Sequence, residues 1–371
     1  MKTLSSACAK GRINTAGCRL AVFFLFCLCF FTACPLNASD SGTKIFPFIK
    51  EGNLCLFDSD SSDFKTCSFG NSFTSSGVAP SKKSGWSLAW NKAKGQLYHV
   101  NGAGKLKSKT SASGATAYVD KNYVLMQGSS FDENKGFSFT LYSIKYSFGG
   151  KKIALKQLWH GSIDCFVSDS FFTENGVCVA GGSRDNTKHN VFYITASGIH
   201  RCFTMAKNSD FLRLVSGGGN KLYAFLSQRE KSKKEAVIYS FTLDGQPDQA
   251  VTINLEEDAL LPSDFDCFFG YGFEMPVVPG GSGGPGVPEA LEGAGGLILP
   301  ASLNGIINFI SYDCNGGKIA RIIPEAVGCT AFLGSSDAGA FYVARDPLID
   351  DSWYGIALFD GKVCKKIKKI F

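Results

Sequence analysis

Histidine is scarce in this sequence, and its cysteines lack the paired spacing of metal ligands. The 371-residue chain has only four histidines, His99, His160, His189 and His200. Nine cysteines follow Cys34, and no two of them form a C-x-x-C pair, which is the usual spacing of zinc ligands. We therefore expect no metal site and no cofactor, and we assign no catalytic residue.

The N-terminal apolar run is too short for a transmembrane helix. Leu20–Phe31 is a charge-free stretch of 12 residues, whereas a helix needs roughly 20 to cross a bilayer. The basic residues that precede it, with no acidic residue among them, are Lys2, Lys10, Arg12 and Arg19. This combination is typical of an export signal, so we predict that residues 1–33 are a signal peptide.

The apolar run ends in Phe31-Thr32-Ala33-Cys34, which resembles a bacterial lipobox in its relaxed, spirochaete-like form. The resemblance implies that Cys34 becomes the acylated first residue of the mature protein. Several acyl chains on one residue would hold the protein firmly at a membrane, with residues 34–43 as a tether. An ordinary signal cut near Ala38, which would release a free protein, is the alternative.

Charge gives no indication of a nucleic-acid partner. The first 33 residues contain four of the 38 basic residues and none of the 32 acidic ones. Their removal therefore lowers the formal net charge from +6 to +2. A mature chain so close to neutrality does not predict nucleic-acid binding.

Self-similarity appears once the glycine turns are aligned. Six segments each contain an apolar or aromatic strand, a glycine turn and a second strand of alternating character. Their turn glycines are Gly104, Gly149, Gly198, Gly245, Gly316 and Gly361. These glycines are 45, 49, 47, 71 and 45 residues apart, which indicates a structural repeat.

The one long interval contains a Pro/Gly-rich stretch at residues 276–296, without which the interval would be 50 residues. We interpret this stretch as an insertion in one repeat. Asn-Gly and Asp-Gly pairs favour type I′ hairpin turns, and they occur in these turns at Asn101-Gly102 and Asp244-Gly245, among others.

A second predicted strand pair precedes each hairpin, so each repeat contains four antiparallel strands. This is the size and content of a β-propeller blade. No strong helical period interrupts residues 44–371, which argues against an α/β fold. We predict an all-β propeller over these residues, with seven blades, or six if the first strands pack elsewhere.

Two cysteines could form a disulfide that cross-links the first predicted blade. Cys55 and Cys67 flank a Ser/Asp-rich turn almost symmetrically, so a disulfide could join them across a hairpin. The alternative is two unpaired buried thiols, because strand alternation alone does not define register. The scattered cysteines of the chain are in general expected to be small buried hydrophobes.

The architecture resembles the propeller-shaped lipoprotein subunit of the outer-membrane β-barrel assembly machine. The lipobox-like signal, the repeats and the strand-turn run IYSFTLDGQ, which begins at Ile238, are similar to that family. The resemblance implies a non-catalytic scaffold in the bacterial cell envelope, on its periplasmic or extracellular side, that binds a protein partner or an envelope polymer. A glycan or peptide hydrolase at the mouth of the propeller channel is the alternative, with Glu256, Asp264 and Ser282 as its candidate residues.

Overall fold

The computed structural model describes most of the chain that follows the predicted tether. The described residues are 45–133, 135–206, 209–216, 221–228, 235–244, 247–254, 273–274, 297–303, 306–312, 318–322, 328–336, 338–346, 350–359 and 364–370. They belong to one compact unit, Gly42–Phe371. Residues 1–33 and 34–43, together with Cys34 and the insertion at 276–296, lie outside the described residues.

Strands dominate the described part of the chain. The strands of its first half are β1 (Ile45–Lys50), β2 (Asn53–Asp58), β3 (Asp63–Thr66), β4 (Phe73–Pro80), β5 (Trp86–Asn91), β6 (Gln96–Asn101), β7 (Leu106–Ser111), β8 (Thr116–Val119), β9 (Tyr123–Asp132), β10 (Gly136–Ser147), β11 (Lys152–Ile163), β12 (Phe166–Phe172), β13 (Gly176–Gly182) and β14 (Lys188–Thr195). A short 3-10 helix, η1 (Lys92–Lys94), lies between β5 and β6.

The second half continues the same pattern. Its strands are β15 (Gly198–Ala206), β16 (Ser209–Ser216), β17 (Lys221–Gln228), β18 (Glu235–Thr242), β19 (Pro247–Asn254), β20 (Phe273–Glu274), β21 (Leu297–Leu303), β22 (Ile306–Tyr312), β23 (Lys318–Ile322), β24 (Gly328–Ser336), β25 (Gly339–Asp346), β26 (Asp350–Phe359) and β27 (Cys364–Lys369). No described helix is long and apolar enough to span a bilayer.

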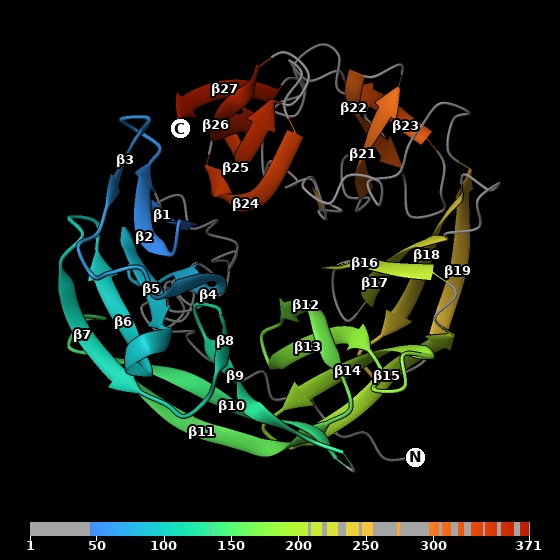
Figure 1. Cartoon of the computed structure of the whole chain (residues 1–371), viewed down its shortest axis with the longest axis horizontal. Coiled ribbons are helices and arrows are strands. Elements are labelled where there is room, and N and C mark those ends of the chain that lie inside the picture. Colours follow the sequence, from blue (N-terminus) through green and yellow to red (C-terminus); the bar gives the residue numbers. More distant parts are fainter. Residues whose placement is uncertain are drawn as a thin grey trace, which may run out of the picture. The chain divides into compact units, whose positions relative to one another are not determined.

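Consecutive strands form antiparallel sheets in the order of the sequence, as Figure 1 shows for β4 to β7 and β8 to β11. In the described residues β1 to β3 form a three-stranded sheet, and β4 to β27 form four-stranded sheets. The all-β, four-stranded repeat is therefore confirmed. The number of propeller blades, seven or six, stays a prediction.

Neighbouring sheets bury each other's faces. β4 contacts β8, and β7 contacts β11, where the Ile153 amide donates to Ser108 Oγ at 3.2 Å. Middle strands such as β13 are buried at nearly every residue, whereas the outer strand β7 is mostly exposed. The side chains between sheets thus make up the core, as the repeat predicted.

The first and last sheets contact each other through side chains. Phe57 and Phe46 of the first sheet pack against Phe341 of β25, with ring centroids 5.2 and 5.6 Å apart respectively. The Lys50 ammonium donates to the Ile370 carbonyl at 3.1 Å. No ladder of the described strands joins the two sheets, so side-chain packing holds them together.

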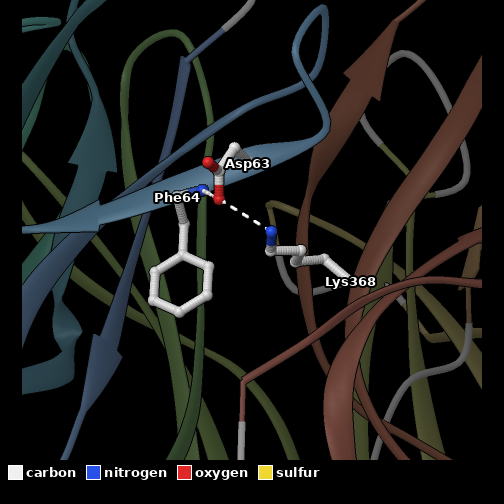
Figure 2. Close-up of polar contacts among 3 residues, drawn as sticks. All are labelled: Asp63, Phe64 and Lys368. Atoms are coloured by element: carbon white, nitrogen blue, oxygen red, sulfur yellow. Dashed lines mark hydrogen bonds and ion pairs between the residues drawn. The ribbon is translucent and has the colours of Figure 1, made fainter.

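An ion pair lies on the outer side of this junction. Lys368 Nζ of β27 lies 3.1 Å from Asp63 Oδ1 at the start of β3. Figure 2 shows how the two side chains point toward each other. The contact with Lys368, followed by the hydrogen bond from the Phe64 amide, lowers the pKa of the Asp63 carboxyl. Both side chains are exposed, so the pair contributes little to stability.

The hairpin turns confirm the alignment of glycines and correct one turn type. Gly104, Gly149 and Gly198 all have positive φ, and each lies at or beside a turn between the third and fourth strands of a sheet. At Asn101-Gly102, however, the left-handed residue is Gly104, whose amide donates to the Asn101 carbonyl at 2.7 Å. The predicted two-residue Asn-Gly turn is therefore wrong there, and the turn is longer.

The structure holds Cys55 and Cys67 as free thiols, so the predicted disulfide is not formed in it. Cys55 packs toward the last sheet with Phe57, whereas Cys67 packs toward the second sheet with Leu56. The reason is register: Cys55 faces Thr66 in the ladder, and the next residue, Cys67, belongs to the opposite face. Cys165, Cys178 and Cys202 are also buried and free, which confirms the expectation of small buried hydrophobes.

Replacement of Phe57 by alanine should strongly destabilise the protein. Phe57 is 0% exposed in the junction between the first and last sheets, and loss of a buried phenylalanine costs about 3–5 kcal/mol. Urea unfolding of the purified protein would measure this change. Phe148→Ala is the matched control, because Phe148 is 71% exposed; equal unfolding midpoints for the two variants would contradict the packing.

Candidate functional site

Three phenylalanine rings meet at one end of two neighbouring sheets. Phe131 lies near the end of β9, Phe137 near the start of β10 and Phe166 at the start of β12. Phe131 and Phe137 are direct partners across the β9–β10 ladder, with ring centroids 5.0 Å apart. Phe166 lies 5.6 Å from Phe131 and 5.3 Å from Phe137. We call these three residues the phenylalanine platform.

The platform is partly open to solvent. Phe166 is 48% exposed, and Phe131 and Phe137 are half-buried. Contacts between aromatic rings in stacked or edge-on geometry contribute about 0.5–1.5 kcal/mol each, so the three rings hold one another in place. The platform therefore offers a rigid apolar surface rather than a single mobile side chain.

Backbone geometry brings the rings together. Gly136, in the turn before Phe137, has φ +85, and a Cβ there would lie 2.3 Å from the Ile163 carbonyl oxygen. Only glycine fits such a left-handed position beside another backbone. The β9–β10 register shifts between Phe137 and Phe139, and such an irregularity re-aims the side chains beyond it.

Carboxylates border the platform. Asp132 and Glu133 directly follow Phe131, and both are exposed. Asp164 lies two residues before Phe166, and its Oδ1 accepts from the Arg184 amide at 2.9 Å. The exposed Lys135 and Arg184 lie beside these carboxylates, so the rim is mixed, with three carboxylates and two cations. An apolar centre with such a rim suits a ligand that has an apolar group and a positive charge.

A serine and a histidine also meet inside the described region. Ser81 Oγ and His99 Nε2 are 2.8 Å apart, a separation that a nucleophile and its base would use. His99 is 0% exposed and Ser81 is buried, and the Trp86 ring lies 4.7 Å from the imidazole. Ser81 Oγ also accepts from the Lys83 amide at 3.2 Å, which is a common turn arrangement.

The Ser81–His99 pair has a structural role in the buried core. Among the described residues no carboxylate accepts a hydrogen bond from His99 Nδ1, so the third member of a triad is missing. Burial lowers the pKa of His99 to about 4; the Lys151 backbone acts in the opposite direction, and the Lys83 charge lowers the pKa further. A substrate would have no exposed surface through which to reach the pair.

The residues that the sequence singled out for chemistry fall elsewhere. Glu256, Asp264 and Ser282, the candidates of the hydrolase alternative, lie outside the described residues, as does Cys34. The described residues contain no group of three or more His, Cys, Asp or Glu side chains that could hold a metal.

Sequence reasoning misses the phenylalanine platform because recurring aromatic residues on strands ordinarily indicate packing between sheets. That interpretation is right for Tyr98, which is buried in the core. The available signal for the platform was position: Phe131 and Phe137 flank a short polar turn rather than the middle of a strand.

No protein-family model and no curated protein matches this chain. The chain is similar in structure to an acylaminoacyl peptidase from Pyrococcus horikoshii (TM-score 0.48, 10% identity, 88% of this chain and 52% of that chain). It is also similar to a prolyl endopeptidase (TM-score 0.50, 9% identity, 94% and 53%). The β-propeller domain of the trilobed protease from Pyrococcus furiosus, which has an open velcro topology, gives a TM-score of 0.49 at 11% identity over 88% of this chain and 97% of that domain.

The fold is thus shared with β-propeller domains, including those of peptidases. The chain spans about half the length of the first two structures. At such low identity the likeness concerns the fold alone, and a propeller fold does not indicate an activity by itself.

The buried histidine predicts a loss of stability in mild acid. Folded His99 has a pKa of about 4, and the ordinary value is 6.5; between these values the unfolded chain binds a proton that the folded chain excludes. Stability therefore falls as the pH drops through this window, and the loss is complete below the folded pKa. Urea midpoints between neutral pH and pH 4 should fall less for His99→Gln than for the unaltered protein. The exposed His160→Gln is the control, and parallel curves for all three would refute this role of His99.

Proposed function

We propose that this protein is a non-catalytic lipoprotein of the bacterial cell envelope that binds a partner protein on a β-propeller scaffold. The observation that supports the proposal most directly is the partly exposed phenylalanine platform of Phe131, Phe137 and Phe166. Soluble proteins seldom leave several contacting aromatic rings open without a binding role.

The platform has the physical character of a binding anchor. Aromatic residues dominate the energetics of protein interfaces, and rigid ones lose little entropy on binding. The carboxylates of Asp132 and Glu133 beside the rings add a charge preference, because a basic residue of the partner would be attracted to them. The partner segment would thus combine an apolar side chain with a lysine or arginine.

The location proposed for this scaffold follows from the N-terminus. Acylation of Cys34 would anchor the protein at a membrane, with the propeller on the periplasmic or extracellular side. A seven-bladed propeller, or a six-bladed one with the first strands packed outside the ring, would then display the platform on a rigid frame. An envelope polymer in place of a protein is an outcome that the binding experiment distinguishes.

Phe166→Ala should weaken partner binding by at least tenfold, because truncation of a central aromatic anchor costs about 2 kcal/mol or more. Binding would be measured by crosslinking in intact envelopes, followed by affinity measurement with the purified crosslinked protein. Phe148→Ala, also an exposed phenylalanine but at the other end of β10, should bind normally.

Two results would overturn this proposal. The first is unchanged binding by Phe166→Ala. The second is turnover of a glycan or peptide library that Ser282→Ala, Glu256→Ala or Asp264→Ala abolishes, since that result would favour the hydrolase alternative. Glycan binding without turnover, sensitive to Phe166→Ala, would replace the protein partner by an envelope polymer.

Cys34→Ser should abolish incorporation of a labelled fatty acid and release the protein from the membrane fraction. A thioether-linked lipid needs the Cys34 sulfur, and an amide-linked fatty acid needs the amino group that cleavage before Cys34 would create. Serine at this position supplies no thiol for the first linkage. Gel mobility and fractionation of cells that express each form would measure the change. A mature N-terminus near Ala38, with no label in either form, would contradict the lipid tether.

A further inference from the structure

Three turns of the second and third sheets lie together at the end opposite to the phenylalanine platform. They are the β4–β5 turn (81–85), the β6–β7 turn (102–105) and the β10–β11 turn (148–151). Lys83 Nζ of the first turn donates to the Gly149 carbonyl of the third at 3.2 Å. A Cβ on Gly102 would lie 2.9 Å from the Gly85 carbonyl oxygen, so the first and second turns also touch.

This part of the chain is strongly basic. Residues 64–119 contain eight lysines and no Asp or Glu, and residues 135–163 contain five lysines and no Asp or Glu. The exposed lysines in or next to the three turns are Lys82, Lys105, Lys107, Lys151 and Lys152. The mature chain as a whole is close to neutral, so this charge is local to these stretches of sequence. Lys92, Lys94 and Lys135 of the same stretches lie at the platform end and are not part of the three turns.

The acidic residues at this end belong to neighbouring turns. Asp120 of the β8–β9 turn is half-buried and accepts from the Asn122 amide at 2.7 Å. Asp58 and Asp60 lie in the β2–β3 turn, and Glu174 in the β12–β13 turn. Asp120 thus borders the basic surface within the third sheet itself, and the other three carboxylates flank it on the first and fourth sheets.

Apolar side chains project from the same turns. Phe148 is 71% exposed and Leu106 is 37% exposed. Phe148 has φ 52, a left-handed conformation that bulky residues rarely adopt. Lys152 Nζ lies 4.6 Å from the centre of its ring. The turn thus presents an aromatic ring to solvent with a cation beside it.

We propose that these three turns form a face that docks on a membrane surface of anionic lipid. Lysine ammonium groups would contact the lipid phosphates while Phe148 and Leu106 enter the boundary between headgroups and acyl chains. A soluble polyanion would use the lysines and leave both apolar side chains in water, so a bilayer fits the combination better. The face acts independently of the lipid on Cys34.

Sedimentation with vesicles of phosphatidylcholine, with and without phosphatidylglycerol, tests the proposal. All proteins carry Cys34→Ser, so that an acyl group cannot contribute to vesicle binding. A failure of the docking proposal is thereby distinguished from a failure of the proposed lipid tether. We expect binding to the anionic vesicles that weakens with salt. Because each lysine near an anionic surface is worth about a fivefold change in affinity, the Lys105→Glu/Lys151→Glu protein should bind more than tenfold more weakly. Phe148→Ala should bind several-fold more weakly.

Matched controls use the opposite end of the same sheets. Lys92→Glu/Lys94→Glu changes the charge equally at η1, and Phe166→Ala removes an exposed ring of the platform; both should bind vesicles normally. Equal losses in Lys92→Glu/Lys94→Glu would show a nonspecific charge effect and overturn the proposal. Normal binding by Phe148→Ala, together with equally tight binding of inorganic polyphosphate, would overturn it in favour of a soluble anion. An environment-sensitive fluorescent dye would be attached to the cysteine of Phe148→Cys. If its emission showed no blue shift with anionic vesicles, insertion of this turn would be excluded.

Discussion

The structure depends on the burial of both faces of each of its first four sheets against their neighbours. A strand such as β13 is buried at nearly every position, which an isolated sheet with one solvated face could not achieve. Hydrophobic packing between sheets therefore sets the spacing of the repeats, and solvent contact falls mainly on the outer strands, the strand ends and the turns. Functional variation is confined to these exposed parts.

The junction of the first and last sheets follows the same physics. Backbone hydrogen bonds join the strands within each sheet, whereas aromatic side chains of β1, β2 and β25 join the first sheet to the last. Burial of large apolar side chains is worth far more than the exposed Asp63–Lys368 pair beside it. Apolar packing thus holds the first and last sheets together, and surface charges contribute little to this junction.

One strand, β10, connects the two proposed surfaces. β10 is 12 residues long, so at about 3.3 Å per residue its ends are roughly 36 Å apart. Phe137 belongs to the phenylalanine platform at one end, and Phe148 follows the other end among lysines. A protein that rests on lipid through the basic turns would direct the platform away from the membrane, where a partner could reach it.

The all-β repeat and most turn positions are predictable from the sequence, because strand alternation and glycine turns such as those at Gly104 and Gly149 are local properties. The sequence leaves open the pairing of Cys55 and Cys67, since a one-residue difference in register sends neighbouring side chains to opposite faces. The folded structure places these thiols against different neighbouring sheets. It also brings Phe166 to Phe131 and Lys83 to Gly149, across sheet boundaries that no local pattern encodes, because contacts between sheets depend on how distant segments pack together.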